Sequence, residues 1–196
     1  MDSELDVLLK KLEQRGMEND SAETVRKKKY LNITRDTGEF LAVMVKATGS
    51  KRILEIGTSN GYSTLWLASS VPAGGHVVTL EIIDEKVAEA KENFAVAGLG
   101  DKIDIQNIKA DRFFETPMEP FDLIFLDAER HEYMGFAARL YDALKPGGVM
   151  ICDNAISHAA ELDEFMKYTN SRSDLVTCLL PVGKGELVAC KEAAPV

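Results

Sequence analysis

From Lys51 onward the sequence alternates between short apolar runs and amphipathic segments. The apolar runs predict strands at 52–56, 77–81, 103–108, 121–127, 148–152, 174–180 and 186–191. The amphipathic segments predict helices at 61–70, 84–97, 132–144 and 157–169. Runs such as Phe121–Leu126 are almost wholly apolar, which is typical of strands buried on both faces. Strands that alternate with helices in this way predict an α/β fold with a doubly wound, mostly parallel seven-stranded sheet. Residues 181–185 form only a short turn, so we expect the last two strands to pair antiparallel as a terminal hairpin.

The N-terminal residues carry a helical pattern of their own. A stripe at helical spacing predicts a helix over residues 3–15; it consists of Leu5, Leu8, Leu9 and Leu12. Residues 16–20 predict a break, and a second short helix is expected from Ser21. A third helix is expected over residues 34–46.

These helices suggest how the chain is organised. We interpret residues 1–30 as a helical annex and residues 31–196 as one ligand-binding domain, with no repeat or linker. The annex is expected to cover an acceptor pocket or a dimer seam without completing the core. Its leucine stripe makes a homodimer the expected assembly.

A glycine-containing loop follows the first predicted strand. Gly57 and Gly61 let the backbone bend sharply and come close to a ligand, between that strand and the helix that begins near Ser63. A helix start offers unpaired N–H groups to a carboxylate or phosphate. Strand–loop–helix units of this kind bind nucleotides in α/β proteins. The spacing differs from the GxGxxG of dinucleotide folds, so a nicotinamide or flavin cofactor is the weaker interpretation.

The second predicted strand ends in Glu81, at the place where such folds put the carboxylate that binds ribose hydroxyls. The run from Glu55 to Ser63 (EIGTSNGYS), with Glu81, resembles the S-adenosylmethionine-dependent O-methyltransferases related to catechol and caffeoyl-CoA O-methyltransferases. The resemblance covers residues 32–191 and includes the segments DTGEFL, LKPGG and GKG. It implies transfer of a methyl group from S-adenosylmethionine to a hydroxyl of a small molecule.

The resemblance also implies donor-binding residues. Glu81 would bind the ribose, Asp111 the adenine amino group, and Ile33 the methionine end. The methionine side would be lined by the loop after the first strand, and the full candidate set adds Glu55, Gly57, Ser59, Gly61, Ser63, Ala110 and Asp127. The alternative for Glu81 is an exposed residue beside a helix start, and the alternative for Asp111 is an N-cap.

A second cluster is expected where two further strands end. Asp127, Asp153 and Asn154 supply two carboxylates and an amide oxygen, a ligand set suited to magnesium, calcium or manganese. In the family that the chain resembles, these positions hold the metal. The cation would bind neighbouring hydroxyls of a vicinal diol or catechol-like acceptor and lower a hydroxyl pKa. The alternative is that each aspartate only caps the helix that follows it.

The chain departs from the better-known relatives at Arg130, where they carry the lysine assigned as general base. An arginine stays protonated and cannot accept the proton. Three possibilities therefore remain open. A metal alone acidifies the acceptor, Arg130 only orients it or stabilises its oxyanion, or His131 or His158 takes the proton. The candidate catalytic set is Asp127, Arg130 and His131.

Composition narrows the classes of partner. The 196 residues carry a formal net charge of −9 without a basic stripe, so nucleic-acid binding is not expected. There is no apolar run of membrane-spanning length and no signal-peptide pattern, and the three cysteines lie in apolar stretches. We therefore expect a cytoplasmic protein with reduced thiols. Competing interpretations are a metal-independent methyltransferase and a donor-binding protein without catalysis. A nucleic-acid or protein-amine methyltransferase and an aminopropyl transferase rank lower.

Overall fold

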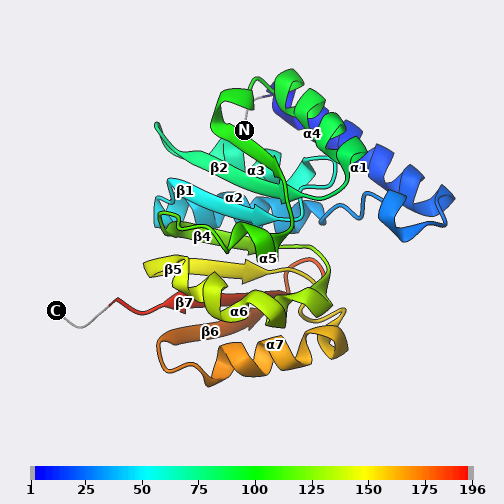
Figure 1. Cartoon of the computed structure of the whole chain (residues 1–196). Helices are drawn as coiled ribbons and strands as arrows, with labels where there is room; N and C mark the ends of the chain where they lie inside the picture. The colour runs from blue at the N-terminus through cyan, green and yellow to red at the C-terminus, as the bar shows by residue number, and fades with distance from the viewer. Residues whose placement is uncertain (1–2, 194–196) are drawn as a thin grey trace.

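The computed structural model describes residues 3–193, and its centre is one seven-stranded sheet (Figure 1). The strands are β1 (Arg52–Ile56), β2 (His76–Glu81), β3 (Ile103–Asn107), β4 (Phe121–Leu126), β5 (Leu144–Cys152), β6 (Leu175–Leu180) and β7 (Glu186–Lys191). Their order is β3-β2-β1-β4-β5-β7-β6. The strands β1 to β5 pair in parallel, and β7 runs antiparallel to both β5 and β6. The mostly parallel sheet with a terminal hairpin is therefore confirmed.

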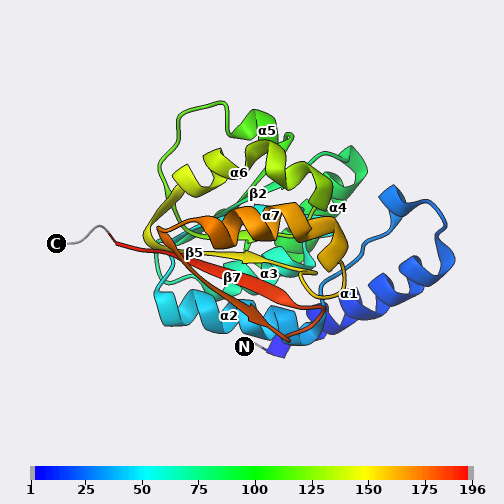
Figure 2. The same ribbon diagram turned by 90° about the horizontal axis from the view of Figure 1, so that it is seen from below.

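Helices cover the sheet on both sides (Figures 1 and 2). The α-helices are α1 (Ser3–Ala22), α2 (Arg35–Thr48), α3 (Tyr62–Ser70), α4 (Asp84–Val96), α5 (Ala110–Phe113), α6 (Tyr133–Asp142) and α7 (Ala159–Ser171). The short 3-10 helices are η1 (Arg26–Lys28), η2 (Gly100–Lys102) and η3 (Arg130–Glu132). Buried side chains of α1 to α4 form one apolar core with the sheet, and those of α5 to α7 form the other. No helix in residues 3–193 has the length and apolar character needed to cross a bilayer.

The N-terminal helix differs from the expectation. It runs through Gly16 without the expected break, and no second helix starts at Ser21. Gly16 is needed because another part of the chain crosses it closely: a Cβ there would lie 2.6 Å from Asn32 Nδ2. This Nδ2 atom donates a hydrogen bond to the Leu12 carbonyl at 3.1 Å, which holds Asn32 against the helix. The glycine therefore marks a close contact, and the helix ends later, where Asp20 accepts hydrogen bonds from the chain that returns.

The leucine stripe packs inside the chain itself. Leu5, Leu9 and Leu12 are buried in the same core as Leu65 and Trp66 of α3. This overturns the expectation that the annex does not complete the core. It also leaves this stripe unavailable for a contact with a second copy, and the homodimer stays a prediction.

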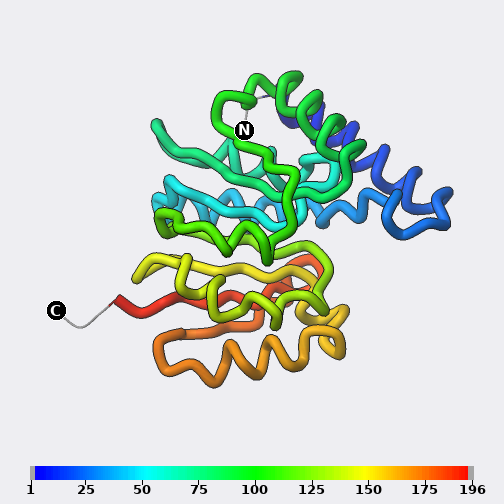
Figure 3. The backbone as a smooth tube through the Cα atoms, viewed as in Figure 1, coloured from blue at the N-terminus to red at the C-terminus, as the bar shows by residue number. Residues whose placement is uncertain are grey.

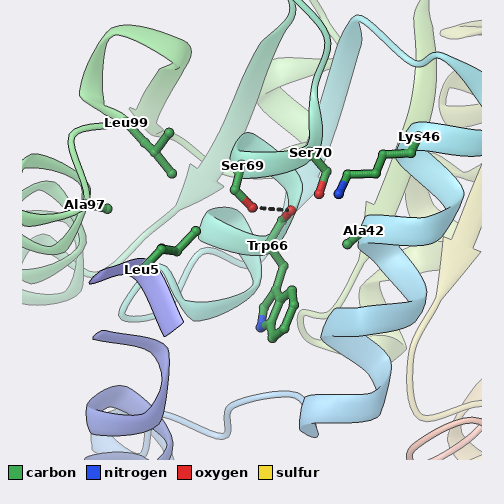
Figure 4. A pocket seen from close by; sticks show the side chains of 8 residues that line it. All are labelled: Leu5, Ala42, Lys46, Trp66, Ser69, Ser70, Ala97 and Leu99. Atoms are coloured by element: carbon green, nitrogen blue, oxygen red, sulfur yellow. Dashed lines mark hydrogen bonds between the residues drawn. The ribbon is translucent and has the colours of Figure 1, made fainter. Parts of the chain in front are cut away.

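A small cavity lies beside the first turn of α1. It measures about 240 Å³ and lies between α1, α2, α3 and the segment after α4 (Figure 4). Its walls are Leu5, Ala42, Lys46, Trp66, Ser69, Ser70, Ala97 and Leu99. Because Ser69 and Ser70 form the last turn of α3, the cavity lies at the end of that helix away from the glycine loop.

One polar side chain is enclosed between the sheet and α3. Glu55 of β1 has no exposed surface, and its carboxyl accepts hydrogen bonds from Ser63 Oγ at 2.6 Å, Thr79 Oγ1 at 2.6 Å and Thr64 Oγ1. Burial raises the pKa of Glu55 to about 7 against the lowering effect of these hydroxyls. The carboxyl thereby joins β1, β2 and the start of α3.

We expect Leu9→Ala to lower the free energy of unfolding by about 2–4 kcal/mol, because it removes a fully buried side chain from the core. Urea denaturation followed by circular dichroism measures this loss. Val7→Ala is the matched control, since Val7 lies on the same helix with 52% of its surface exposed; its effect should stay within about 0.5 kcal/mol. Equal effects of the two substitutions would contradict the docking of α1.

The raised pKa of Glu55 makes stability depend on pH. The unfolded chain releases this proton near the ordinary value of 4.5, whereas the folded chain keeps it up to about 7. The stabilisation that Glu55 contributes is therefore complete below pH 4.5. It falls as the pH rises from 4.5 and is lost once the pH has passed through 7. Relative to Glu55→Gln, which cannot ionise, the wild-type protein should lose about 2–3 kcal/mol between pH 5 and pH 8. A parallel pH dependence of the two proteins would show that Glu55 ionises normally.

Candidate functional site

A pocket of about 750 Å³ lies at the carboxyl ends of the parallel strands. Its walls come from the loop after β1, from the ends of β2, β3 and β4, from Asn154 after β5, and from the turn between β6 and β7. Residues 23–33, here called the strap, connect α1 to α2 along this edge of the molecule (Figure 3) and close one side. Carboxyl ends of parallel strands are where open α/β sheets bind ligands.

The glycines of the loop after β1 are required by packing within the protein. Gly57 has φ +108°, and a Cβ there would lie 2.2 Å from the backbone oxygen of Asp127. Gly61 has φ +87°, and a Cβ there would lie 2.4 Å from Phe94 on α4. Gly57 lines the pocket, whereas Gly61 lies behind it. We expected both glycines to let a ligand come close. For Gly61 the structure gives a different reason, which is the close packing of the loop on α4.

Ser59 and Glu81 tie this loop to β2. The Glu81 carboxylate accepts the backbone N–H of Ser59 at 2.8 Å, of Ile82 at 2.8 Å and of Ile83 at 3.0 Å. Its side chain also lines the pocket, as the strand-end pattern predicted. Glu81 is therefore a fixed acceptor, neither an exposed residue nor a cap.

The other predicted residues of the loop divide into two groups. Ser63 lines the pocket, but its hydroxyl is directed to Glu55. Glu55 itself does not line the pocket, because it is buried beneath the loop. Asn60, which the sequence analysis did not single out, lines the pocket, and its buried Nδ2 has no hydrogen-bond partner among the described residues.

The strap contributes residues that sequence reasoning missed. Ile33 lines the pocket as expected, and Tyr30 lines the pocket too. The Tyr30 carbonyl accepts the Ser59 hydroxyl at 2.7 Å, and Lys86 of α4 donates to the Lys29 carbonyl at 2.7 Å. Burial lowers the pKa of Lys86, which also lines the pocket. Only a close approach of two segments far apart in sequence brings these groups together.

The apolar part of the pocket lies after β2 and β3. Ile82, Ile108, Ala110 and Phe136 supply it. Asp111 is exposed and does not line the pocket; its Oδ1 accepts the N–H of Arg112 at 2.8 Å. Asp111 lies inside α5, whose N-cap is Lys109, so the structure supports neither the adenine contact nor the N-cap, and Ala110 is the neighbour that lines the pocket.

Asp127, Asp153 and Asn154 meet where β4 and β5 end. The Nδ2 atom of Asn154 lies 3.1 Å from Asp127 Oδ1 and 3.0 Å from Asp153 Oδ2. Burial, together with the repulsion between the two aspartates, raises the pKa of Asp127 well above its usual range, and burial raises that of Asp153. A cation would relieve this repulsion. Within residues 3–193, no group of three or more His, Cys, Asp or Glu side chains has metal-binding geometry, and the third predicted ligand is an amide.

Glu186 of β7 is a further buried acid beside this cluster, and the sequence analysis did not identify it. Thr37 of α2 donates to Glu186 Oε1 at 2.9 Å. Burial and the proximity of Asp153 raise the pKa of Glu186 to about 9. The sequence alone could not identify Glu186 as part of this cluster. It reaches the cluster because the antiparallel pairing places the start of β7 opposite Cys152, which precedes Asp153.

The basic side chains near the cluster are held in different ways. Arg130 is buried, and its Nε donates to Glu161 of α7 at 2.8 Å. His131 lines the pocket but is largely exposed, and its Nδ1 lies 3.8 Å from Glu129. His158 lines the pocket as well, and its Nδ1 lies 2.9 Å from the Ser157 hydroxyl. Arg130 is therefore placed to orient neighbouring groups, and both histidines face the same space.

Comparison with known proteins agrees with this geometry. A sequence profile of the O-methyltransferase family matches residues 4–185. The catechol O-methyltransferase of Niastella koreensis is 36% identical over 141 residues, which cover 68% of this chain and 62% of that enzyme. The caffeoyl-CoA O-methyltransferase of Petroselinum crispum is 31% identical over 174 residues, which cover 76% of this chain and 72% of that enzyme. This chain therefore spans less than two thirds of the length of the Niastella enzyme.

A solved structure extends the likeness to the whole fold. The O-methyltransferase of Bacillus cereus in complex with SAH has a TM-score of 0.80 at 27% identity, covering 98% of this chain and 92% of that chain. The profile match spans almost the entire sequence, and the strand-end pocket lies on a sheet of the same architecture. This protein therefore belongs to the O-methyltransferase family and has the class I methyltransferase fold.

Proposed function

We propose that this protein transfers the methyl group of S-adenosylmethionine to a hydroxyl of a small vicinal diol or catechol-like molecule, with the help of a divalent cation. One observation carries the proposal: a single pocket contains both the Glu81 end of the sheet and the Asp127–Asn154 end. A donor and an acceptor bound at these two ends would share one enclosed space. Methyl transfer requires such contact between the two reacting molecules.

The residues present fit the donor. Glu81 is a fixed carboxylate suited to ribose hydroxyls, and the apolar wall formed by Ile82, Ile108 and Phe136 suits a purine ring. The unpartnered amide of Asn60 lies near the start of α3, where an acceptor such as the carboxylate of the donor would satisfy it. Bound S-adenosylmethionine supplies a methyl group on a positively charged sulfur.

The residues present also fit a divalent cation. Asp127 and Asp153 are two repelling carboxylates whose burial favours a neutralising partner. The amide of Asn154 points its nitrogen at both of them, so it would have to rotate to offer its oxygen as the third ligand. Such a cation lowers the pKa of a bound hydroxyl, and the small number of protein ligands suits magnesium or manganese.

The chain's own residues would then position the acceptor and receive its proton. Arg130 is held by Glu161 and stays charged, so its role is to stabilise negative charge on the acceptor oxygen. His131 and His158 both face the pocket, and a neutral imidazole there could take the hydroxyl proton. Loss of the hydroxyl proton would leave an oxygen nucleophile, and its attack on the methyl group would release the sulfur as a neutral thioether.

A second candidate is a methyltransferase without a metal. The observation that favours it is the pair of hydrogen bonds from Asn154 Nδ2 to Asp127 and Asp153, which already satisfies both carboxylates. In that case the cluster would only fix the ends of β4 and β5.

We expect Glu81→Gln to weaken binding of S-adenosylhomocysteine by tenfold or more, since removal of a charged hydrogen-bond acceptor costs about 1.5–3 kcal/mol. Titration calorimetry measures the change. Glu85→Gln is the matched control, because Glu85 is an exposed residue of α4 outside the pocket. Unchanged affinity would remove Glu81 from the donor site, and binding of NAD in place of the methyl donor would refute the proposal.

We expect EDTA to abolish methylation of a vicinal diol while donor binding is retained, and added Mg²⁺ or Mn²⁺ to restore activity. Asp153→Asn should lose both turnover and Mn²⁺ binding measured by electron paramagnetic resonance, and no added metal should rescue it. Asp163→Asn, on the exposed side of α7, serves as the control. Full activity of both the EDTA-treated enzyme and Asp153→Asn would favour the metal-free candidate.

A further inference from the structure

The pocket carries an excess of unpaired positive charge although the chain as a whole has a net charge of −9. Its six cationic wall residues are Arg26, Lys27, Lys86, Lys109, Arg130 and Lys184. Four of them are engaged: Lys86 donates to a carbonyl, and Arg26, Lys109 and Arg130 pair with the carboxylates of Glu129, Glu132 and Glu161. The side-chain ammonium groups of Lys27 and Lys184 have no hydrogen bond or ion pair with any part of residues 3–193.

The acidic wall residues, in contrast, all have partners. Glu81 accepts three backbone N–H groups, and Asp127 accepts the Asn154 amide. Glu129 lies 3.7 Å from Arg26, and Glu132 lies 3.9 Å from Lys109. Among the charged side chains of the pocket wall, those of Lys27 and Lys184 are therefore the ones without a hydrogen bond or ion pair to another described residue.

Lys184 is held at the acceptor end by its backbone. Its carbonyl accepts the N–H of Ser157 at 2.9 Å, and the neighbouring Gly185 carbonyl accepts that of Ala155 at 2.8 Å. Gly185 has φ +99°, and a Cβ there would lie 2.4 Å from Ile156. The turn is thus packed against the segment that follows Asn154. The positive charge of the Lys184 ammonium lowers the pKa of Asp127 and of Asp153, and so opposes the larger effect of burial, which raises both.

Lys27 approaches the same end of the pocket from the strap. It belongs to η1, and its neighbour Arg26 reaches Glu129 beside η3. The charge of Arg26 also helps to lower the pKa of Glu161, after the larger effects of Arg130 and His158. The two unpaired lysines therefore lie on walls that face the acceptor end.

We propose that the acceptor is an anionic small molecule, an aromatic vicinal diol that bears a carboxylate, and that Lys184 is the main residue selecting it. Lys27 contributes a weaker attraction, because it is exposed and screened by solvent. A carboxylate gains a charge-assisted hydrogen bond from Lys184, whereas a neutral diol leaves the ammonium unpaired and a cationic diol is repelled. The inference rests on the proposed function and names its substrate class.

The test uses three acceptors with the same ring and diol but different charges: 3,4-dihydroxybenzoate, 3,4-dihydroxybenzamide and 3,4-dihydroxybenzylamine. We expect kcat/KM to fall in that order, with the acid preferred over the amide by about tenfold. Lys184→Gln should bring the ratio of acid to amide close to one, and Lys184→Arg should keep most of it. Lys27→Gln should lower the ratio about two- to threefold, and more at low ionic strength. Lys28→Gln, which makes the same charge change in η1 outside the pocket, should leave the ratio unchanged.

Dissociation constants of the same acceptors, measured by calorimetry with S-adenosylhomocysteine present, separate this inference from the proposed function. Turnover of all three diols with equal kcat/KM in the wild-type and Lys184→Gln proteins would overturn the charge selection and leave the methyl transfer standing. Absence of turnover with all three would refute the proposed function. If turnover is absent, the binding data still decide the inference. Tighter binding of the acid than of the amide, lost in Lys184→Gln, would support it, and equal binding of the two would overturn it.

Discussion

The buried carboxyl of Glu55 is the contact on which the geometry of the pocket depends. It accepts hydrogen bonds from hydroxyl groups of β2 and of the first turn of α3, and these bonds fix the start of α3 against β1 and β2. With both ends of the loop after β1 fixed, Ser59 meets Glu81, and Gly57 meets the backbone of Asp127. The donor end and the acceptor end of the pocket are thereby joined through one short loop. A neutral carboxyl can hold this position in the core at moderate pH, whereas a buried charge would oppose it.

Much of the fold was predictable because its signals are local. Continuous apolar runs marked the strands of a sheet covered on both faces, and the short turn after β6 marked the antiparallel hairpin. The acids that end β2, β4 and β5 line or adjoin the pocket, since parallel strands end at the same edge. Local patterns failed at Gly16, where the reason for the glycine is Asn32 from another segment. They failed similarly at Glu55, whose carboxyl is turned into the core and does not line the pocket.

The site residues that sequence reasoning missed share a physical cause. Glu186 and Lys184 reach the cluster only because β7 pairs antiparallel with β5 and brings the preceding turn to the ends of the parallel strands. Lys86 meets the Lys29 carbonyl, and Ser59 meets the Tyr30 carbonyl, only because the strap folds back over α4 and the loop after β1. Asp111 shows the opposite error, a strand-end acid whose side chain serves its own turn. Position at a strand end predicts proximity to the ligand, while side-chain direction depends on contacts that are distant in sequence.

The strap links α1 to the pocket, and this has a thermodynamic consequence. Asp20 at the end of α1 accepts hydrogen bonds from the backbone of Tyr30 and Leu31, and the Leu12 carbonyl accepts one from the Asn32 amide, so docking of α1 helps to hold the strap beside the pocket. A ligand that contacts the strap would therefore be linked to the docking of α1, and each would stabilise the other by the same free energy. Substitutions in the leucine core of α1, remote from any ligand, will consequently change apparent ligand affinity as well as stability. In this protein, variation at the amino-terminal helix offers a route to tuning the active site without altering a single residue that lines it.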